Sequence, residues 1–297
     1  MIAALFALSA LAPGAQDPPQ FGVAVDAVRV DVFVGRGDRP LEGLAAGDFE
    51  VRDDGAPQEI TLVARERTAL HALLVLDVSG SVAGPKLRSL KHAARAFLAG
   101  LGEGDRATLL AFSYEIRRIG ADRAAALEVA DALDSLRAGG PTALHDAVYA
   151  AIASAGSPSE TSLVVVFSDG QDRLSWLSPE PVVRAARGSQ SPVYAVFLAD
   201  RVVGSDTRDH GPPLISYEET PAFLESVATE SGGRLLRATS PEELTAHFQA
   251  IVEEAKTRYV LEFQPAADAA PGWHDLEVRV RHRKATVRAR RGYLLAR

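Results

Sequence analysis

Cysteine is absent from the 297 residues of the chain, which excludes disulfides, thiolate zinc sites and a cysteine nucleophile. The absence does not discriminate between compartments, because an exported protein can lack disulfides as easily as a cytosolic one. A basic run is also missing before Arg279, and the formal net charge is -7. Since phosphate binding needs concentrated Lys and Arg, we do not expect a nucleic acid as partner.

The C-terminal segment HDLEVRVRHRKATVRARRGY (274–293) does hold many basic residues. They alternate with Val and Ala, which is typical of a strand with one solvated face. This segment therefore does not change the expectation about nucleic acids.

No apolar run is long enough to span a bilayer, so we expect no transmembrane span. Residues 1–15 (MIAALFALSALAPGA) combine a short apolar run with small residues and resemble a secretory signal peptide. We expect cleavage near Ala15 and a secreted or periplasmic location. Because no Lys or Arg precedes the run, an unstructured tail and a misplaced start codon stay open as alternatives.

Two segments, residues 21–66 and 256–297, have the alternation of β-strands. In the first, Val28, Val30 and Val32 alternate with other side chains, and Asp54-Gly55 is a hairpin turn signal. Each segment is too short to build a good core alone. We therefore expect them to pair into one smaller β-sandwich-like domain that is interrupted by residues 68–255.

Residues 68–255 alternate between short apolar runs and helical patterns, which predicts an α/β fold with a doubly wound, mostly parallel sheet covered on both faces. The expected strands are 71–78, 106–113, 162–169 and 192–199, with a short edge strand at EIRRIG (115–120) and a brief strand at 233–238. The expected helices are 85–101, 121–136, 142–156, 218–231 and 240–254, the last opened by a capping box at Ser240.

The sequence Asp77-Val78-Ser79-Gly80-Ser81 directly follows the first apolar run. Alone it is a weak signal, because Asp, Ser and Gly are common in turns. Thr142, after two glycines and a proline, and Asp169, after the run 162–168, strengthen it. Ligands of open parallel sheets bind at the carboxyl ends of the strands where strand order reverses, so these side chains should converge.

The converging side chains would form a site of oxygen atoms only, which favours Mg²⁺, with Mn²⁺ or Ca²⁺ as alternatives. We expect the hydroxyl groups to touch the cation and Asp77 and Asp169 to neutralise it. A cation bound largely by neutral hydroxyls stays electrophilic and can accept a carboxylate from a partner.

The set Asp77-x-Ser79-x-Ser81, Thr142 and Asp169 resembles the metal-ion-dependent adhesion site of von Willebrand factor type A domains, and all five positions match by residue type. The resemblance covers about residues 68–255. It implies Mg²⁺ at the top of the sheet, with Ser79, Ser81 and Thr142 as direct ligands. It also implies a protein partner that offers an Asp or Glu carboxylate to the free position.

The flanking segments are similar, more loosely, to those of bacterial secreted proteins whose type A domain sits between β segments. The resulting hypothesis is a cation-dependent binding module without catalysis. Two alternatives stay open: a domain that keeps these residues without binding metal, and a structural or assembly subunit in which the β domain makes the contacts and the cation only stabilises a loop.

Three enzymatic interpretations are disfavoured. The glycines of GSVAGPK (80–86) are misspaced for a phosphate-binding loop. An aspartyl-phosphate enzyme would need a second Asp where Ser79 stands. A serine hydrolase would need a G-x-S-x-G elbow, which the chain lacks.

Several other residues have a structural and a functional interpretation. His145 is expected on a helix surface, and Asp105, Asp122 and Asp172 in turns or caps, with Asp172 close enough to influence the site. Trp176, in the segment 169–179, either contacts a partner or packs on its own loop. The segment 200–217 is expected to be a second loop at the rim of the site.

Overall fold

The computed structural model describes residues 27–37, 39–64, 69–155, 161–170, 172–199, 219–282 and 284–295. The expected signal peptide at 1–15 and the expected loop at 200–217 lie outside the described residues. Among the helices of the described part, none is both long and apolar enough to cross a membrane.

A six-stranded sheet forms the centre of the α/β unit, and the order of its strands is β11-β10-β9-β6-β7-β8. Neighbouring strands are parallel except β7 and β8, which are antiparallel. The strands are β6 (Leu70–Asp77), β7 (Arg106–Phe112), β8 (Ile116–Ala124), β9 (Thr161–Ser168), β10 (Val193–Leu198) and β11 (Leu235–Ala238). The chain leaves β6 toward β7 on one side and later returns as β9 on the other, so strand order reverses at β6, as expected.

The buried strands divide their side chains between two cores because successive residues point to opposite faces. In β6, Leu74 and Leu76 pack into the core on one face, and Leu73 and Val75 pack into the core on the other. This explains why the expected strands show continuous apolar runs.

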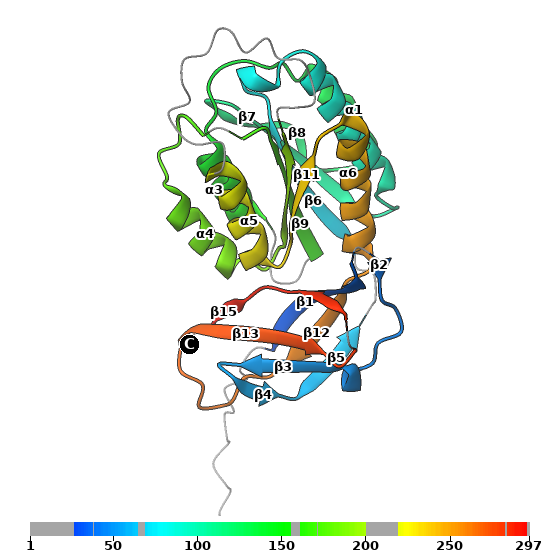
Figure 1. Cartoon of the computed structure of the whole chain (residues 1–297), viewed down its shortest axis with the longest axis vertical. Coiled ribbons are helices and arrows are strands. Elements are labelled where there is room, and N and C mark those ends of the chain that lie inside the picture. Colours follow the sequence, from blue (N-terminus) through cyan, green and yellow to red (C-terminus); the bar gives the residue numbers. More distant parts are fainter. Residues whose placement is uncertain are drawn as a thin grey trace, which may run out of the picture.

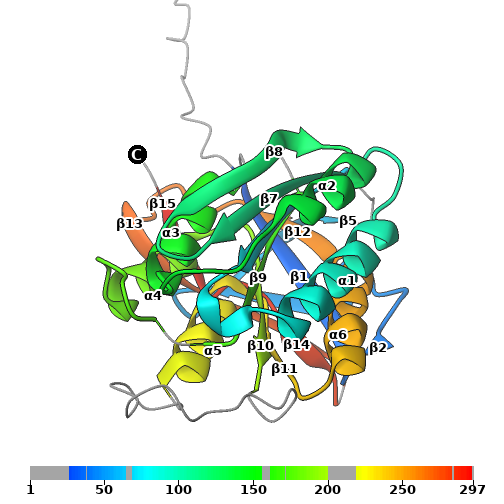
Figure 2. The ribbon, with the colours of Figure 1, turned by 90° about the horizontal axis from the view of Figure 1, so that it is seen from above.

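In the part of the chain that the structure describes, six α-helices cover the two faces of this sheet, with α1, α2 and α6 on one side and α3, α4 and α5 on the other (Figures 1 and 2). Their bounds are α1 (Pro85–Gly100), α2 (Ala126–Ala132), α3 (Leu144–Ser154), α4 (Pro179–Gly188), α5 (Glu219–Ser231) and α6 (Pro241–Lys256). Phe97 of α1 and Phe248 of α6 meet edge to face, with ring centroids 6.1 Å apart. The described residues also include the 3₁₀ turns η1 (Ala46–Asp48), η2 (Gly80–Val82) and η3 (Leu133–Ser135).

The capping box expected at Ser240 is only half formed. Ser240 Oγ accepts a 3.1 Å hydrogen bond from Glu243 N, as the pattern predicts. The Glu243 side chain accepts from Thr239 N instead of Ser240 N, at 2.7 Å. The start of α6 was therefore predicted correctly, although the reciprocal bond goes to the preceding residue.

Two local predictions were wrong, and one helix was not predicted. Residues 121–124, expected to be helical, extend β8, and Ala124 pairs with Ala107 of β7. Helix α4 was not predicted, although Ser178-Pro179 is a typical helix start. The expected strand ATVRARRGY (285–293) is broken, because β14 (Thr286–Arg288) pairs with β1 whereas β15 (Gly292–Leu295) pairs with β13 in another sheet.

Strands from both ends of the chain build two further sheets, of order β14-β1-β12-β5, with β2 beside β1, and β15-β13-β3-β4. Their bounds are β1 (Val28–Arg36), β2 (Arg39–Pro40), β3 (Phe49–Asp53), β4 (Ala56–Gln58), β5 (Ile60–Ala64), β12 (Tyr259–Phe263) and β13 (Gly272–Val280). The sheets share a core in which Phe49 and Tyr259 meet at 5.3 Å between ring centroids. The division of the chain into a host β domain and an inserted unit stays a prediction.

Candidate functional site

Asp77 is the last residue of β6, and its side chain is fully buried. Its Oδ1 atom accepts a hydrogen bond from Ser79 N at 2.8 Å, which closes the turn after the strand. Its Oδ2 atom accepts from Ser168 Oγ at 2.7 Å. Because Ser168 ends the neighbouring strand β9, the carboxylate joins the ends of two adjacent parallel strands.

A chain of hydroxyl groups connects this turn to Asp169. Ser79 Oγ and Ser81 Oγ lie 3.0 Å apart, and Ser81 Oγ donates to Asp169 Oδ1 at 2.7 Å. The other oxygen of Asp169, Oδ2, accepts from Lys86 Nζ at 2.9 Å. The structure therefore brings Asp77, Ser79, Ser81 and Asp169 together at the carboxyl ends of β6 and β9, the edge of the sheet that faces away from the two β sheets (Figure 1).

Thr142 lies on the segment that packs between the two loops of this site. Gly80 N donates to Gly140 O at 2.8 Å, which holds this segment against the turn after Asp77. The carbonyl oxygen of Thr142 accepts from Arg173 N at 2.8 Å, which holds it against the segment after β9. Thr142 is buried, and these backbone bonds hold its segment against the loops that carry the other four residues.

Burial and the nearby Asp169 carboxylate raise the pKa of Asp77 from 3.8 to about 7. Removing a carboxylate from water disfavours its charged form, and a second carboxylate disfavours it further. The hydrogen bonds from Ser79 and Ser168 oppose this rise without cancelling it. The carboxylates of Asp77 and Asp169 thus form a cluster of oxygen atoms whose negative charge a cation would stabilise.

Two residues of this cluster, Ser168 and Lys86, were not predicted to belong to it. Ser168 is adjacent to Asp169 in sequence, so the end of the apolar run was an available signal. Lys86 was considered only for a phosphate-binding loop. Nothing local in the sequence indicates that its ammonium group contacts Asp169, because 83 residues separate the two.

The remaining predictions have mixed outcomes. Asp105 accepts from Gly102 N at 2.6 Å and is a turn residue, as expected. Asp172 accepts from His145 N at 2.9 Å at the start of α3, a capping role.

His145 is not on a helix surface: its Nδ1 lies 3.0 Å from Leu177 O, and its ring packs on that of Phe223. Asp122 lies in β8 rather than in a turn and accepts from Thr108 Oγ1 at 2.7 Å.

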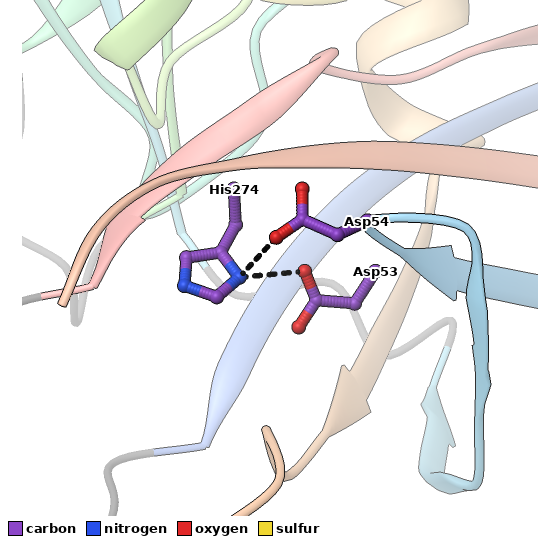
Figure 3. Close-up of side chains that lie close together, drawn as sticks. All are labelled: Asp53, Asp54 and His274. Carbon is purple, nitrogen blue, oxygen red and sulfur yellow. Dashed lines mark hydrogen bonds and ion pairs between the residues drawn. The ribbon is translucent and has the colours of Figure 1, made fainter. Parts of the chain in front are cut away.

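A second cluster, which the sequence did not indicate, joins Asp53, Asp54 and His274 in the β sheets (Figure 3). Their potential ligand atoms lie within 4.8 Å of one another, which is close enough for a shared metal ion. His274 Nδ1 is 3.0 Å from Asp53 Oδ1 and 3.0 Å from Asp54 Oδ2.

Hydrogen bonds account for this second cluster without an ion. His274 Nε2 lies 2.7 Å from the carbonyl oxygen of Ala270, and Tyr293 Oη donates to Asp53 Oδ2 at 2.7 Å. The bond to Ala270 and the carboxylates of Asp53 and Asp54 raise the pKa of His274 above its ordinary 6.5. A protonated imidazole that donates from both nitrogens fits this arrangement.

The open, mostly parallel sheet with helices on both faces defines the chain as a doubly wound α/β protein. The von Willebrand factor type A domain matches residues 73–249, and the chain belongs to this family. In sequence it is 24% identical over 215 residues to inter-alpha-trypsin inhibitor heavy chain H3 of Homo sapiens, covering 67% of this chain and 22% of that protein. It is also 24% identical over 174 residues to heavy chain H4 of Sus scrofa, covering 55% of this chain and 17% of that protein.

The chain thus spans about a fifth of the length of these curated relatives. Among solved structures, von Willebrand factor type A from Catenulispora acidiphila is similar at a TM-score of 0.51 and 13% identity, over 93% of this chain and 75% of that chain. This similarity is one of fold. The matched 93% of this chain is longer than the α/β unit alone, so the similarity includes strands of the two β sheets.

Proposed function

We propose that the chain is a divalent-cation-dependent protein-binding module and not an enzyme. The observation that carries the proposal is the hydrogen-bonded group of Asp77, Ser79, Ser81 and Asp169 at the carboxyl ends of β6 and β9. Its donor set is hydroxyl and carboxylate oxygen, the set that Mg²⁺, Mn²⁺ and Ca²⁺ prefer.

Mg²⁺ is the proposed cation, with Ser79, Ser81 and Thr142 as its direct ligands. Asp77 and Asp169 neutralise it through water. The raised pKa of Asp77 supports this assignment, because a cation beside this buried carboxylate would offset the cost of its burial and the repulsion from Asp169. A cation with three neutral ligands retains the capacity to bind a carboxylate, so the proposed partner is a protein that presents an Asp or Glu.

Large apolar side chains are exposed on the segments next to Thr142, and we assign them to the partner interface. Trp176 is 96% exposed, Tyr114 is 57% exposed and Leu174 is 47% exposed. The amide of Leu174 donates to Thr142 O, and the ring of Tyr114 lies against Gly140. Exposed aromatic groups beside a polar anchor are typical of residues that dominate binding energy.

We further propose an exported protein in which residues 68–255 form the type A domain and residues 21–66 with 256–297 form a sandwich-like host domain. Export and the removal of residues 1–15 rest on the sequence resemblance to a signal peptide.

A structural or assembly subunit is the second candidate function. Leu62 on β5 is 42% exposed, and Leu294 on β15 is 70% exposed. Both strands lie at sheet edges, where unpaired backbone groups can add a strand from another chain. In this case the β sheets hold the partner and the cation only stabilises the loops of the site.

Calorimetric titration of chelator-treated protein with Mg²⁺, Mn²⁺ and Ca²⁺ tests the proposal. We expect one saturable site that Asp77→Ala, Ser79→Ala and Thr142→Ala abolish, whereas Ser135→Ala, on the exposed η3 turn, leaves it intact. Partners captured from extracellular material with and without chelator then separate the two functions. Capture that survives chelation, or that persists in Asp77→Ala, favours assembly through the β sheets.

A further inference from the structure

Lys86 lies in the first turn of α1, and only 6% of its surface is exposed. A buried lysine is costly unless its charge is compensated, because the ammonium group loses its hydration. Its Nζ atom lies 2.9 Å from Asp169 Oδ2, and the exposed fractions of the two side chains are 7% and 3%. The cluster proposed to bind a divalent cation thus already contains a positive charge supplied by the chain.

Both oxygens of Asp169 are bonded within the protein, one to Ser81 and one to Lys86. A divalent cation that uses Ser81 and is neutralised by Asp169 needs these same groups. The ammonium group and the cation therefore compete for one carboxylate, whether the cation reaches it directly or through water.

We infer that Lys86 is an internal counter-cation: it stabilises Asp169 when no divalent cation is bound, and it weakens divalent binding by competing for that carboxylate. The inference rests on the proposed function, since it concerns the affinity of the same site. As a consequence, the domain stays folded without metal and binds the divalent cation only when the cation concentration is high.

A lysine that only stabilises the fold would behave differently. Removing it would lower the stability of the protein, as breaking any buried ion pair does, but would not tighten cation binding. The sign of the change in cation affinity therefore distinguishes the two roles.

The test compares Lys86→Met and Lys86→Gln, two neutral variants of similar length, with wild type. Lys91→Met is the matched control, because Lys91 lies on the same helix but contacts the carbonyl oxygen of Leu136. Chelated samples are titrated calorimetrically with Mg²⁺ and with Mn²⁺. Thermal unfolding is followed in chelator and in an excess of Mg²⁺ over the dissociation constant that the titration gives, because a cation that binds the folded state stabilises it.

We expect both neutral variants to bind the cations about tenfold more tightly than wild type, the scale on which one adjacent charge shifts a coupled equilibrium. We also expect a lower melting temperature in chelator and a larger rise on adding Mg²⁺. A neutral variant that folds only with the cation present supports the inference too, because the cation then replaces the ammonium group. Cation binding by the variants but not by wild type supports it as well and shows that Lys86 keeps the wild-type site closed to metal.

Unchanged or weaker affinity in folded Lys86 variants overturns the inference while the proposed cation site of the wild type stands. Variants that stay unfolded with and without the cation also overturn it. Absence of binding in both wild type and variants overturns the cation-dependent function together with the competition.

Discussion

Ser168 donates a 2.7 Å hydrogen bond to Oδ2 of Asp77 and joins the ends of two neighbouring strands. The same hydroxyl oxygen accepts from Gly170 N at 3.1 Å, so it also shapes the backbone around Asp169. Ser168 is fully buried, and its hydroxyl orients the Asp77 carboxylate and fixes the backbone next to Asp169.

Replacing Ser168 should therefore affect both the site and the fold. We expect Ser168→Ala to weaken Mg²⁺ binding about tenfold, as loss of a group that orients a ligand does. We also expect it to lower the free energy of unfolding by about 1–3 kcal/mol through the unpaired Asp77 oxygen. Ser162→Ala is the control: Ser162 is buried at the opposite end of β9, where it bonds to Ser191. Equal loss of cation affinity in both variants would contradict the positioning role.

Cation binding should depend on pH through Asp77, whose pKa is raised to about 7 by burial and by Asp169. Since the cation requires the ionised carboxylate, we expect Mg²⁺ affinity to rise as pH increases up to about 7 and to level off above it. Titrations at three pH values around this pKa measure the effect. An affinity that does not change with pH would show that Asp77 is already ionised in the metal-free protein.

The metal-free fold should show the opposite trend. The folded state keeps the Asp77 proton at pH values where the unfolded chain, with the ordinary pKa of 3.8, has lost it. This group therefore lowers the free energy of unfolding as pH rises from about 4 to about 7. Urea unfolding of wild type and of Asp77→Asn, both in chelator, measures the effect across this pH range. The free energy of unfolding of Asp77→Asn should lack the decrease that Asp77 causes.

His274 contributes stability that is present at low pH. Its pKa lies above 6.5 because its ring donates to Ala270 and faces Asp53 and Asp54. Its contribution is complete below pH 6.5 and is lost as pH rises through the folded pKa. We expect His274→Gln to remove this component of the pH dependence, whereas His92→Gln, on the exposed face of α1, should retain it. An identical pH profile for His274→Gln and wild type would contradict the ion pair.

Glu254 of α6 is a buried carboxylate that faces guanidinium groups from both parts of the fold. Its oxygens lie 3.0 Å from Arg234 Nε and 2.7 Å from Arg288 Nη2, the latter on β14. Neutralising it leaves buried cations uncompensated, so we expect Glu254→Gln to lower the free energy of unfolding by about 3–5 kcal/mol. Chemical denaturation measures this loss, and the exposed neighbour Glu253→Gln should stay within about 0.5 kcal/mol of wild type.

The elements of the α/β unit were largely predictable, because periodicity in the sequence reports burial on one or both faces. The apolar run before Asp77 indicated a strand buried on both sides, and β6 is such a strand. Helix α4 was missed although its buried residues Val182 and Ala186 have helical spacing. The break between β14 and β15 was missed because strand periodicity does not report which sheet a strand joins.

For the site, local sequence determined the turn Asp77-x-Ser79-x-Ser81, since a short-range hydrogen bond from Ser79 N to the Asp77 carboxylate shapes it. Because neighbouring parallel strands end at the same edge of a sheet, it was also predictable that Asp169 lies near this turn. Only the tertiary structure decided that Ser168 bonds Asp77, that Lys86 neutralises Asp169 and that His274 meets Asp53 across 221 residues. Such contacts depend on strand register and helix placement, which side-chain packing over the whole chain sets and which no local pattern records.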